Sequence, residues 1–63
     1  MPTVFVNGPK MDDLDKKRAV VKGITDVIEK VYEKKRDEIV VIIREDEGTN
    51  AAKGGVLVCD LLK

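Results

Sequence analysis

Apolar and polar positions along this chain form three successive patterns, which predict a strand, a helix and a second strand. The first pattern is the apolar run within residues 3–6, which stops at the turn sequence Asn7-Gly8-Pro9. The second has apolar residues at helical spacing, at Val21, Ile24, Ile28 and Val31. We expect Asp12 to cap this helix, and the basic run 34–36 to lie at its carboxyl end, where the helix dipole favours cations.

The third pattern is the run Ile39-Val40-Val41-Ile42-Ile43, which is β-branched at every position. Because no polar residue alternates within it, we expect a strand that is buried on both faces. Strand, helix and strand together predict a βαβ unit with parallel strands and a right-handed crossover. One helix covers only one face of such a sheet, so the other face is expected to meet further copies of the chain.

The last third of the chain predicts a small addition to this unit. Gly48-Thr49-Asn50 is typical of a loop, and Gly54-Gly55 of a tight turn that leads into residues 56–59. We expect a short hairpin or a single late strand here. Leu61 and Leu62 keep the end of the chain apolar, which favours docking on a neighbouring subunit. The fold class is therefore α/β, with residues 1–63 forming one domain.

Size and composition support assembly and exclude several classes of function. A chain of 63 residues is marginally stable alone, and one cysteine with no histidine supplies neither an internal disulfide nor a structural zinc site. Twelve basic and twelve acidic residues, with no tryptophan, argue against a nucleic-acid binder. The sequence contains no membrane-spanning run and no signal-peptide pattern, so we expect a cytoplasmic protein. Its abundance of Lys and Glu, without Gln, hints at a thermophile.

Conventional catalytic and metal-binding groups are scarce. A histidine-based triad is impossible without histidine, and Cys59 lies in an apolar run where a thiol more often packs than reacts. The acids at positions 12, 13 and 15 are better explained as helix caps and dipole partners than as metal ligands. Gly54-Gly55 lacks the pattern of a phosphate-binding loop. We therefore expect neither a metal site nor a phosphate-binding loop.

The remaining chemical feature is Met1-Pro2. Removal of Met1 would leave Pro2 with a free secondary amine at the start of the first strand. An ordinary amino terminus titrates near ~7.7–8.0, and partial burial or nearby cations would lower the pKa of this more basic amine. The shift brings the amine towards neutrality, where a general base works best.

Three segments together resemble the 4-oxalocrotonate tautomerase family. They are the start Pro2-Thr3-Val4-Phe5-Val6, the strand 39–43, and the loop 50–55, which matches the family's Asn-x-x-x-Gly-Gly segment. The resemblance implies a βαβ subunit with a late hairpin, assembled as a hexamer that is built from three dimers. It also implies that the Pro2 amine shuttles a proton between carbon and oxygen of 2-hydroxydienoates or enols of 2-oxo acids, without metal or cofactor. Cationic side chains, some from neighbouring subunits, would hold the substrate carboxylate.

The residues that would bind substrate differ from the family pattern. The cation nearest to the end of the first strand is Lys10, where the family has an arginine just after that strand. Val40 occupies the position of the family's second arginine, and Arg44, four residues later on the same face of a regular strand, is the candidate replacement. Ala51 replaces the family's aromatic wall before the double glycine, which enlarges the pocket.

Two alternatives stay open. The same scaffold could carry out a related reaction, such as decarboxylation or hydration of an unsaturated acid, because the pocket cations differ. The chain could also be a non-catalytic oligomeric binding protein, since an attached Met1 turns the Pro2 nitrogen into an amide with no basicity.

Overall fold

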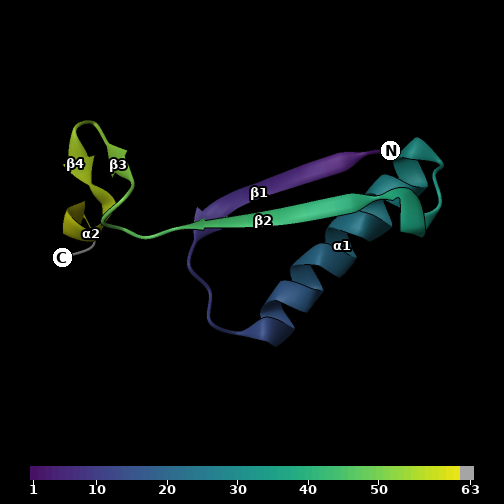
Figure 1. The fold of residues 1–63 in the computed structure, drawn as a ribbon, viewed down its shortest axis with the longest axis horizontal. Coiled ribbons are helices and arrows are strands. Elements are labelled where there is room, and N and C mark those ends of the chain that lie inside the picture. Colours follow the sequence, from purple (N-terminus) through teal and green to yellow (C-terminus); the bar gives the residue numbers. More distant parts are fainter. Residues whose placement is uncertain (62–63) are drawn as a thin grey trace.

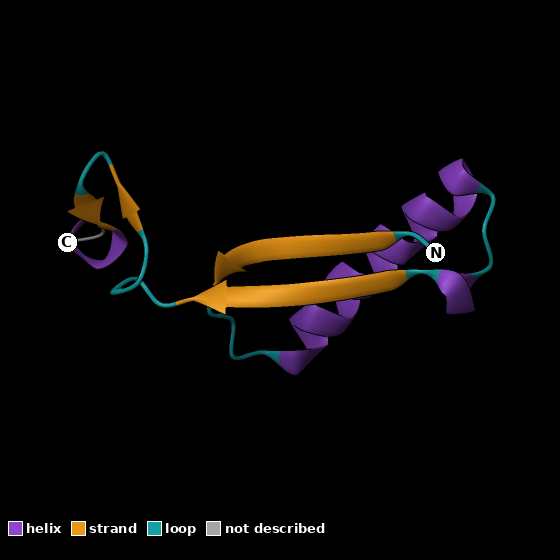
Figure 2. Cartoon of the chain, turned by 45° about the horizontal axis from the view of Figure 1, so that its top comes forward, coloured by secondary structure: helices purple, strands orange, loops and turns teal. Residues whose placement is uncertain are grey.

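A computed structural model of the protein describes residues 1–61. Its main body consists of two strands and a long helix, and a small arm follows at the carboxyl end (Figures 1 and 2). The elements in chain order are β1 (Thr3–Pro9), α1 (Leu14–Tyr32), the 3₁₀ turn η1 (Arg36–Glu38), β2 (Val40–Asp46), β3 (Ala52–Lys53), β4 (Val56–Leu57) and α2 (Val58–Leu61).

The two long strands are parallel, which confirms the βαβ prediction. The register runs from Thr3 opposite Val40 to Pro9 opposite Asp46. Both strands are longer than the sequence predicted, and the predicted turn Asn7-Gly8-Pro9 belongs to β1. These residues stay extended because residues 44–46 of β2 continue beside them. Proline is tolerated at the last position, since no further ladder bond is required of its nitrogen.

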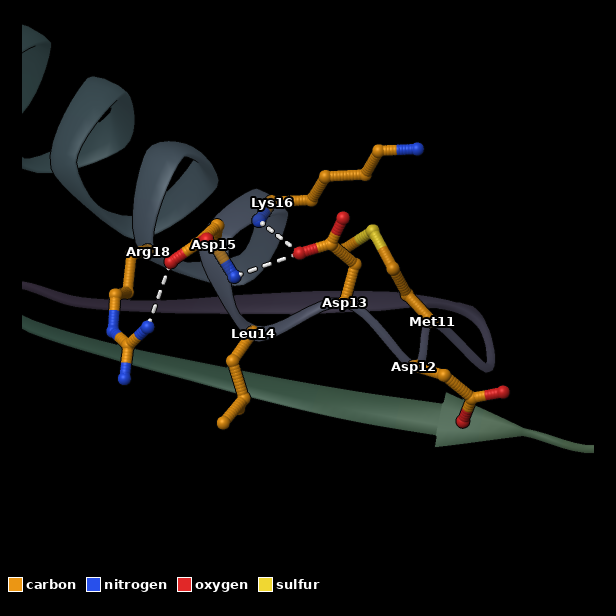
Figure 3. A pocket seen from close by; sticks show the side chains of 7 residues that line it. All are labelled: Met11, Asp12, Asp13, Leu14, Asp15, Lys16 and Arg18. Carbon is orange, nitrogen blue, oxygen red and sulfur yellow. Dashed lines mark hydrogen bonds and ion pairs between the residues drawn. The ribbon is translucent and has the colours of Figure 1, made fainter.

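Helix α1 confirms the helix that the apolar spacing predicts, but its first and last residues differ from the prediction. Its cap is Asp13, not Asp12: the backbone of Asp13 is extended, and its Oδ1 accepts hydrogen bonds from the amides of Asp15 at 2.9 Å and Lys16 at 3.3 Å (Figure 3). The helix stops before the predicted basic run, because Glu33 adopts a left-handed conformation with φ of 54°.

The basic run ties the chain back to the helix. Arg36 lies in η1, and its Nη1 donates to Asp26 Oδ1 at 2.7 Å and to Glu29 Oε1 at 3.0 Å. Asp26 Oδ2 also accepts from Lys22 at 3.0 Å. These contacts hold η1 against α1, immediately before β2 begins.

The carboxy-terminal arm, residues 47–61, contains the predicted hairpin. Ala52 lies opposite Leu57 and Lys53 opposite Val56, joined by Gly54 and Gly55 with φ of 60° and 81°. Two positive φ values at the centre of a two-residue turn are the type I′ pattern that glycine favours. The predicted extension of the strand through Cys59 is wrong, because residues 58–61 form the helical turn α2. The apolar residue Leu62 lies outside the described residues.

One copy of the chain leaves much apolar surface uncovered. Within residues 1–61 no side chain is fully buried. Helix α1 covers one face of the sheet, while Phe5 and Ile42, which are register partners on the other face, remain 50% and 38% exposed. The radius of gyration is 14.8 Å, against about 10.6 Å for a compact domain of this length. The burial of β2 on both faces that the sequence predicts is therefore not reached within one chain.

No helix within residues 1–61 combines the length and the apolar character that crossing a bilayer requires.

Candidate active site

Pro2 lies at the amino-terminal edge of the sheet, just before β1. It is half-buried, and its carbonyl oxygen accepts a hydrogen bond from the amide of Val40 at 2.9 Å. This bond extends the parallel ladder by one step and holds the backbone of Pro2 beside the first residue of β2. Met1 is 85% exposed, so its removal would sacrifice little packing.

Lys10 and Ala51 lie together at the opposite edge of the sheet. Both line a surface cavity of about 520 Å³, within the usual range for small-molecule sites. It opens between the end of β1 and the carboxy-terminal arm. The other lining residues are Asn7, Gly8, Pro9, Asp46, Glu47, Gly48 and Val58. The amide of Val58 donates to the carbonyl oxygen of Ala51 at 2.8 Å, which holds this wall of the cavity in place.

The ammonium group of Lys10 is only loosely engaged. Its Nζ lies 3.9 Å from Asp12 Oδ1 and 4.0 Å from Glu47 Oε1, at the outer limit of an ion pair, and its side chain is mostly exposed. Such contacts contribute little to stability. They leave Lys10 able to bind an incoming carboxylate as a point charge.

Glu45 anchors the loop that carries Lys10, a role that the sequence did not suggest. Glu45 faces α1 from β2, where its Oε1 accepts from Lys17 Nζ at 2.7 Å and its Oε2 accepts from the amide of Met11. The Lys17 ammonium and then the Met11 amide hold the pKa of Glu45 below its ordinary value of 4.5. The charged run 44–47 was the available signal, but only the register shows that Glu45 points towards the helix.

Arg44 shares a face of the sheet with Val40, as a regular strand requires, but it is not one of the residues that line the cavity. It is the register partner of Asn7, and its guanidinium carbon stands 4.6 Å from the centre of the Phe5 ring. This is a cation–π contact on the uncovered face. Asn7 is five residues beyond Pro2 in an extended strand, so Arg44 lies roughly 17 Å along the sheet from Pro2.

One chain therefore separates the predicted site residues: Pro2 lies at one end of the sheet, Lys10 and Ala51 lie at the other, and Arg44 lies between them on the uncovered face. Lys10 lies eight positions after Pro2, with the extended strand β1 between them, which corresponds to roughly 26 Å. Figure 1 shows the amino terminus at one end of the two long strands and the β3–β4 hairpin beyond the other. One chain brings Lys10 and Ala51 together and keeps Pro2 apart from both.

The acids near the start of α1 line a shallow, open depression with Met11, Leu14, Lys16 and Arg18 (Figure 3). Asp13 is occupied as the helix cap, and Asp15 Oδ1 accepts from Arg18 Nη1 at 2.8 Å. In the described part of the chain, no group of three or more His, Cys, Asp or Glu side chains is arranged to hold a metal ion.

Comparison with known proteins gives a family match and several solved structures of the same fold. The family described as "Tautomerase enzyme" matches residues 2–60. DmpI from Archaeoglobus fulgidus is 37% identical, with 94% of this chain and 100% of that chain covered and a TM-score of 0.85. YwhB, a homologue of 4-oxalocrotonate tautomerase, is 25% identical, with 94% and 97% covered and a TM-score of 0.87.

A 4-oxalocrotonate tautomerase isozyme from Methylibium petroleiphilum is 18% identical, with 97% of this chain and 95% of that chain covered. Its TM-score of 0.90 shows a common fold. Comparison with curated proteins gives no match. The family match spans nearly the whole sequence, and the alignment with the Archaeoglobus protein covers nearly all of both chains. The chain therefore belongs to the tautomerase family, as its resemblance to 4-oxalocrotonate tautomerase predicted.

Proposed function

We propose that this protein is a cofactor-independent tautomerase that moves a proton between carbon and oxygen of an enol or 2-hydroxydienoate, using the amine of Pro2. The observation that carries the proposal is the family match, which begins at Pro2 and runs to residue 60. The exposure of Met1 supports it, because a processing enzyme can reach this residue without unfolding the strand.

The proposed chemistry needs one group that both accepts and donates a proton. The neutral Pro2 amine takes the hydroxyl proton of the enol as the C–O bond becomes a carbonyl. The resulting ammonium then delivers a proton to the substrate carbon, which restores the neutral amine. An amine with a pKa near neutrality is suited to both steps.

Lys10 supplies the positive charge of the proposed site. It would hold the substrate carboxylate and oppose the negative charge that develops during proton transfer. Ala51 would form part of the wall against the hydrocarbon portion of the substrate, in a cavity that has room for it. Arg44 would act from the uncovered sheet face, where a second copy is expected.

The distance between Pro2 and Lys10 supports a site that is built from more than one copy. No side-chain rotation spans roughly 26 Å, so the Pro2 of one copy would meet the cavity of another. The uncovered pair Phe5 and Ile42 and the exposed apolar residues of the arm, Val56, Leu57 and Leu61, offer surface for such contacts. We expect a homo-oligomer, and a hexamer from the family resemblance.

The experiment that tests this function pairs intact mass with turnover. The mass of the purified protein reports whether Met1 has been removed, and ultraviolet absorbance follows ketonisation of phenylenolpyruvate and 2-hydroxymuconate. Replacement of Pro2 with Ala leaves a primary amine and should lower kcat at least tenfold, with folding intact by circular dichroism. Turnover at the wild-type rate in this variant would refute the role of Pro2.

A mixing experiment tests whether two copies share the site. Pro2→Ala and Lys10→Ala variants are each expected to be weakly active. When they are unfolded together and refolded, mixed assemblies contain sites with an intact Pro2 and an intact Lys10, so activity should rise above the mean of the two. Activity of the mixed assemblies equal to the mean of the two variants would contradict a site that two copies share. Product analysis by NMR separates isomerisation from decarboxylation and hydration, which yield different products.

A further inference from the structure

Two carboxylates share the cavity with Lys10. Asp46 and Glu47 are both lining residues, and of the described residues in the lining, Lys10 alone is cationic. Within residues 1–61 Asp46 has no ion-pair partner, and Glu47 is engaged only by Lys10, at 4.0 Å. The fixed charges of the lining therefore amount to one positive and two negative groups.

We propose that Asp46 and Glu47 make this cavity selective for acids with a single carboxylate and discriminate against dicarboxylates. The inference rests on the proposed function, since it assigns a substrate class to the same site. One carboxylate can pair with Lys10 in place of the loosely held Glu47 and Asp12. A second carboxylate on the same molecule must sit elsewhere in the cavity, where it meets like charge.

The rest of the lining offers a second carboxylate no cation. Pro9, Ala51 and Val58 are apolar, and Asn7 supplies at most an amide hydrogen bond. An ionised group placed against such a surface loses hydration without gaining a charged partner. A hydrocarbon or aromatic group has no such hydration to lose, so the same surface favours a substrate with an apolar tail.

The other nearby cations are already engaged outside the cavity. Lys17 donates to Glu45 at 2.7 Å on the helix side of the sheet. The guanidinium of Arg44 stands over the Phe5 ring on the opposite face and does not belong to the lining. The Lys17 charge is therefore already paired with Glu45. The Arg44 guanidinium keeps its charge but is directed to the Phe5 ring and not into the lining.

The test compares an enol acid that has one carboxylate with an enol acid that has two. In the processed wild-type protein, kcat/KM for phenylenolpyruvate should exceed that for 2-hydroxymuconate by roughly tenfold at low ionic strength. Two like charges several ångströms apart across water account for a change of about threefold to fivefold each. Glu47→Gln and Asp46→Asn should therefore each raise the dicarboxylate-to-monocarboxylate ratio by that factor, and added salt should compress the ratio.

The matched control is Glu33→Gln, which removes one negative charge at the turn after α1, away from the cavity. It should leave the ratio unchanged. A wild-type preference for the dicarboxylate, or an unchanged ratio in the double variant Glu47→Gln with Asp46→Asn, overturns the inference.

Binding measurements separate this inference from the proposed function. Sorbate and muconate are unreactive six-carbon dienoates with one and two carboxylates, and their dissociation constants can be measured by NMR titration. If the wild type turns over neither enol, the proposed function fails, but tighter binding of sorbate than of muconate still supports the selectivity. Equal binding, tighter binding of muconate, or binding of neither acid overturns it.

Discussion

Replacing Ile42 with Asp tests whether the uncovered face of the sheet is an interface between copies. Ile42 is the third residue of β2 and lies opposite Phe5, on the face that α1 does not cover. In an assembly that closes this face, the substitution places a carboxylate among apolar side chains. In a chain that works alone, the same carboxylate points into water.

The two cases differ in the size of the expected effect. Full burial of an isoleucine stabilises by about 1.5–3 kcal/mol, and the 38% of Ile42 that is still exposed in one chain leaves roughly 0.6–1.1 kcal/mol for an interface to gain. Burial of an unpaired carboxylate adds several kcal/mol. A total of at least ~3 kcal/mol per copy corresponds to a loss on the order of a hundredfold in the association constant.

Sedimentation equilibrium at several protein concentrations measures this loss, and circular dichroism reports the fold. We expect Ile42→Asp to dissociate and, because no described side chain is fully buried in one copy, to unfold at a lower temperature. Thr49→Asp, which adds the same charge to an exposed loop, is the control and should assemble like the wild type. A folded Ile42→Asp monomer with native heat stability would show that the uncovered face needs no partner.

Three further predictions concern the arm and the ion pairs. Gly54 has φ of +60° and open space where an alanine Cβ would lie, so Gly54→Ala should cost about 1 kcal/mol in thermal or urea unfolding, and Gly54→Asn clearly less. Gly48→Ala would place a Cβ 3.1 Å from the Cys59 amide nitrogen, so the α2 turn must shift, and NMR shifts at Cys59 should move while those of α1 do not. Hydrogen-bonded ion pairs lower the pKa of Asp26, through Arg36, from 3.8 and the pKa of Glu45, through Lys17, from 4.5. The stability that each pair contributes is complete above the ordinary pKa of its acid, and it is lost as the pH falls through the lowered pKa of the folded protein. The fall in Tm on acidification should therefore be smaller in Asp26→Asn than in the wild type.

The sequence predicts the main elements because their patterns are strong and local. The β-branched run 39–43 and the helical spacing from Val21 to Val31 both correspond to observed elements. The first and last residues of each element are less predictable, because they depend on contacts with neighbouring segments of the chain. Asn7-Gly8-Pro9 remains strand because β2 lies beside it, and adjacent acids at 12 and 13 are equivalent as caps until the backbone selects one.

The arm shows tertiary hydrogen bonds overriding local preference. Residues 56–59 have the composition of a strand, yet the chain turns into α2 after Leu57. The amide of Val58 bonds to Ala51 and the amide of Cys59 bonds to Gly48 at 3.1 Å, which folds this segment back on its own loop. No pattern within residues 56–59 encodes partners that lie seven to eleven positions earlier.

The site was only partly predictable for a related reason. Pro2, Lys10 and Ala51 were found through residue type and family resemblance, and their roles stay predictions. Asp46 and Glu47 were not predicted as site residues, because their place beside Lys10 follows from the parallel register and the path of the arm. Residue type alone does not show which charges share a cavity.

The separation of Pro2 from the Lys10 cavity by the length of β1 has a consequence for how such a chain can diversify. The hydrogen bonds of the hairpin and α2 join residues 48–59 to one another, whereas Pro2 is held by the ladder to Val40. Variation in the arm can therefore reshape what is recognised while the proton-transfer end keeps its backbone. A combinatorial library restricted to residues 47–53 of the arm would explore new acids with Pro2 and its strand unchanged.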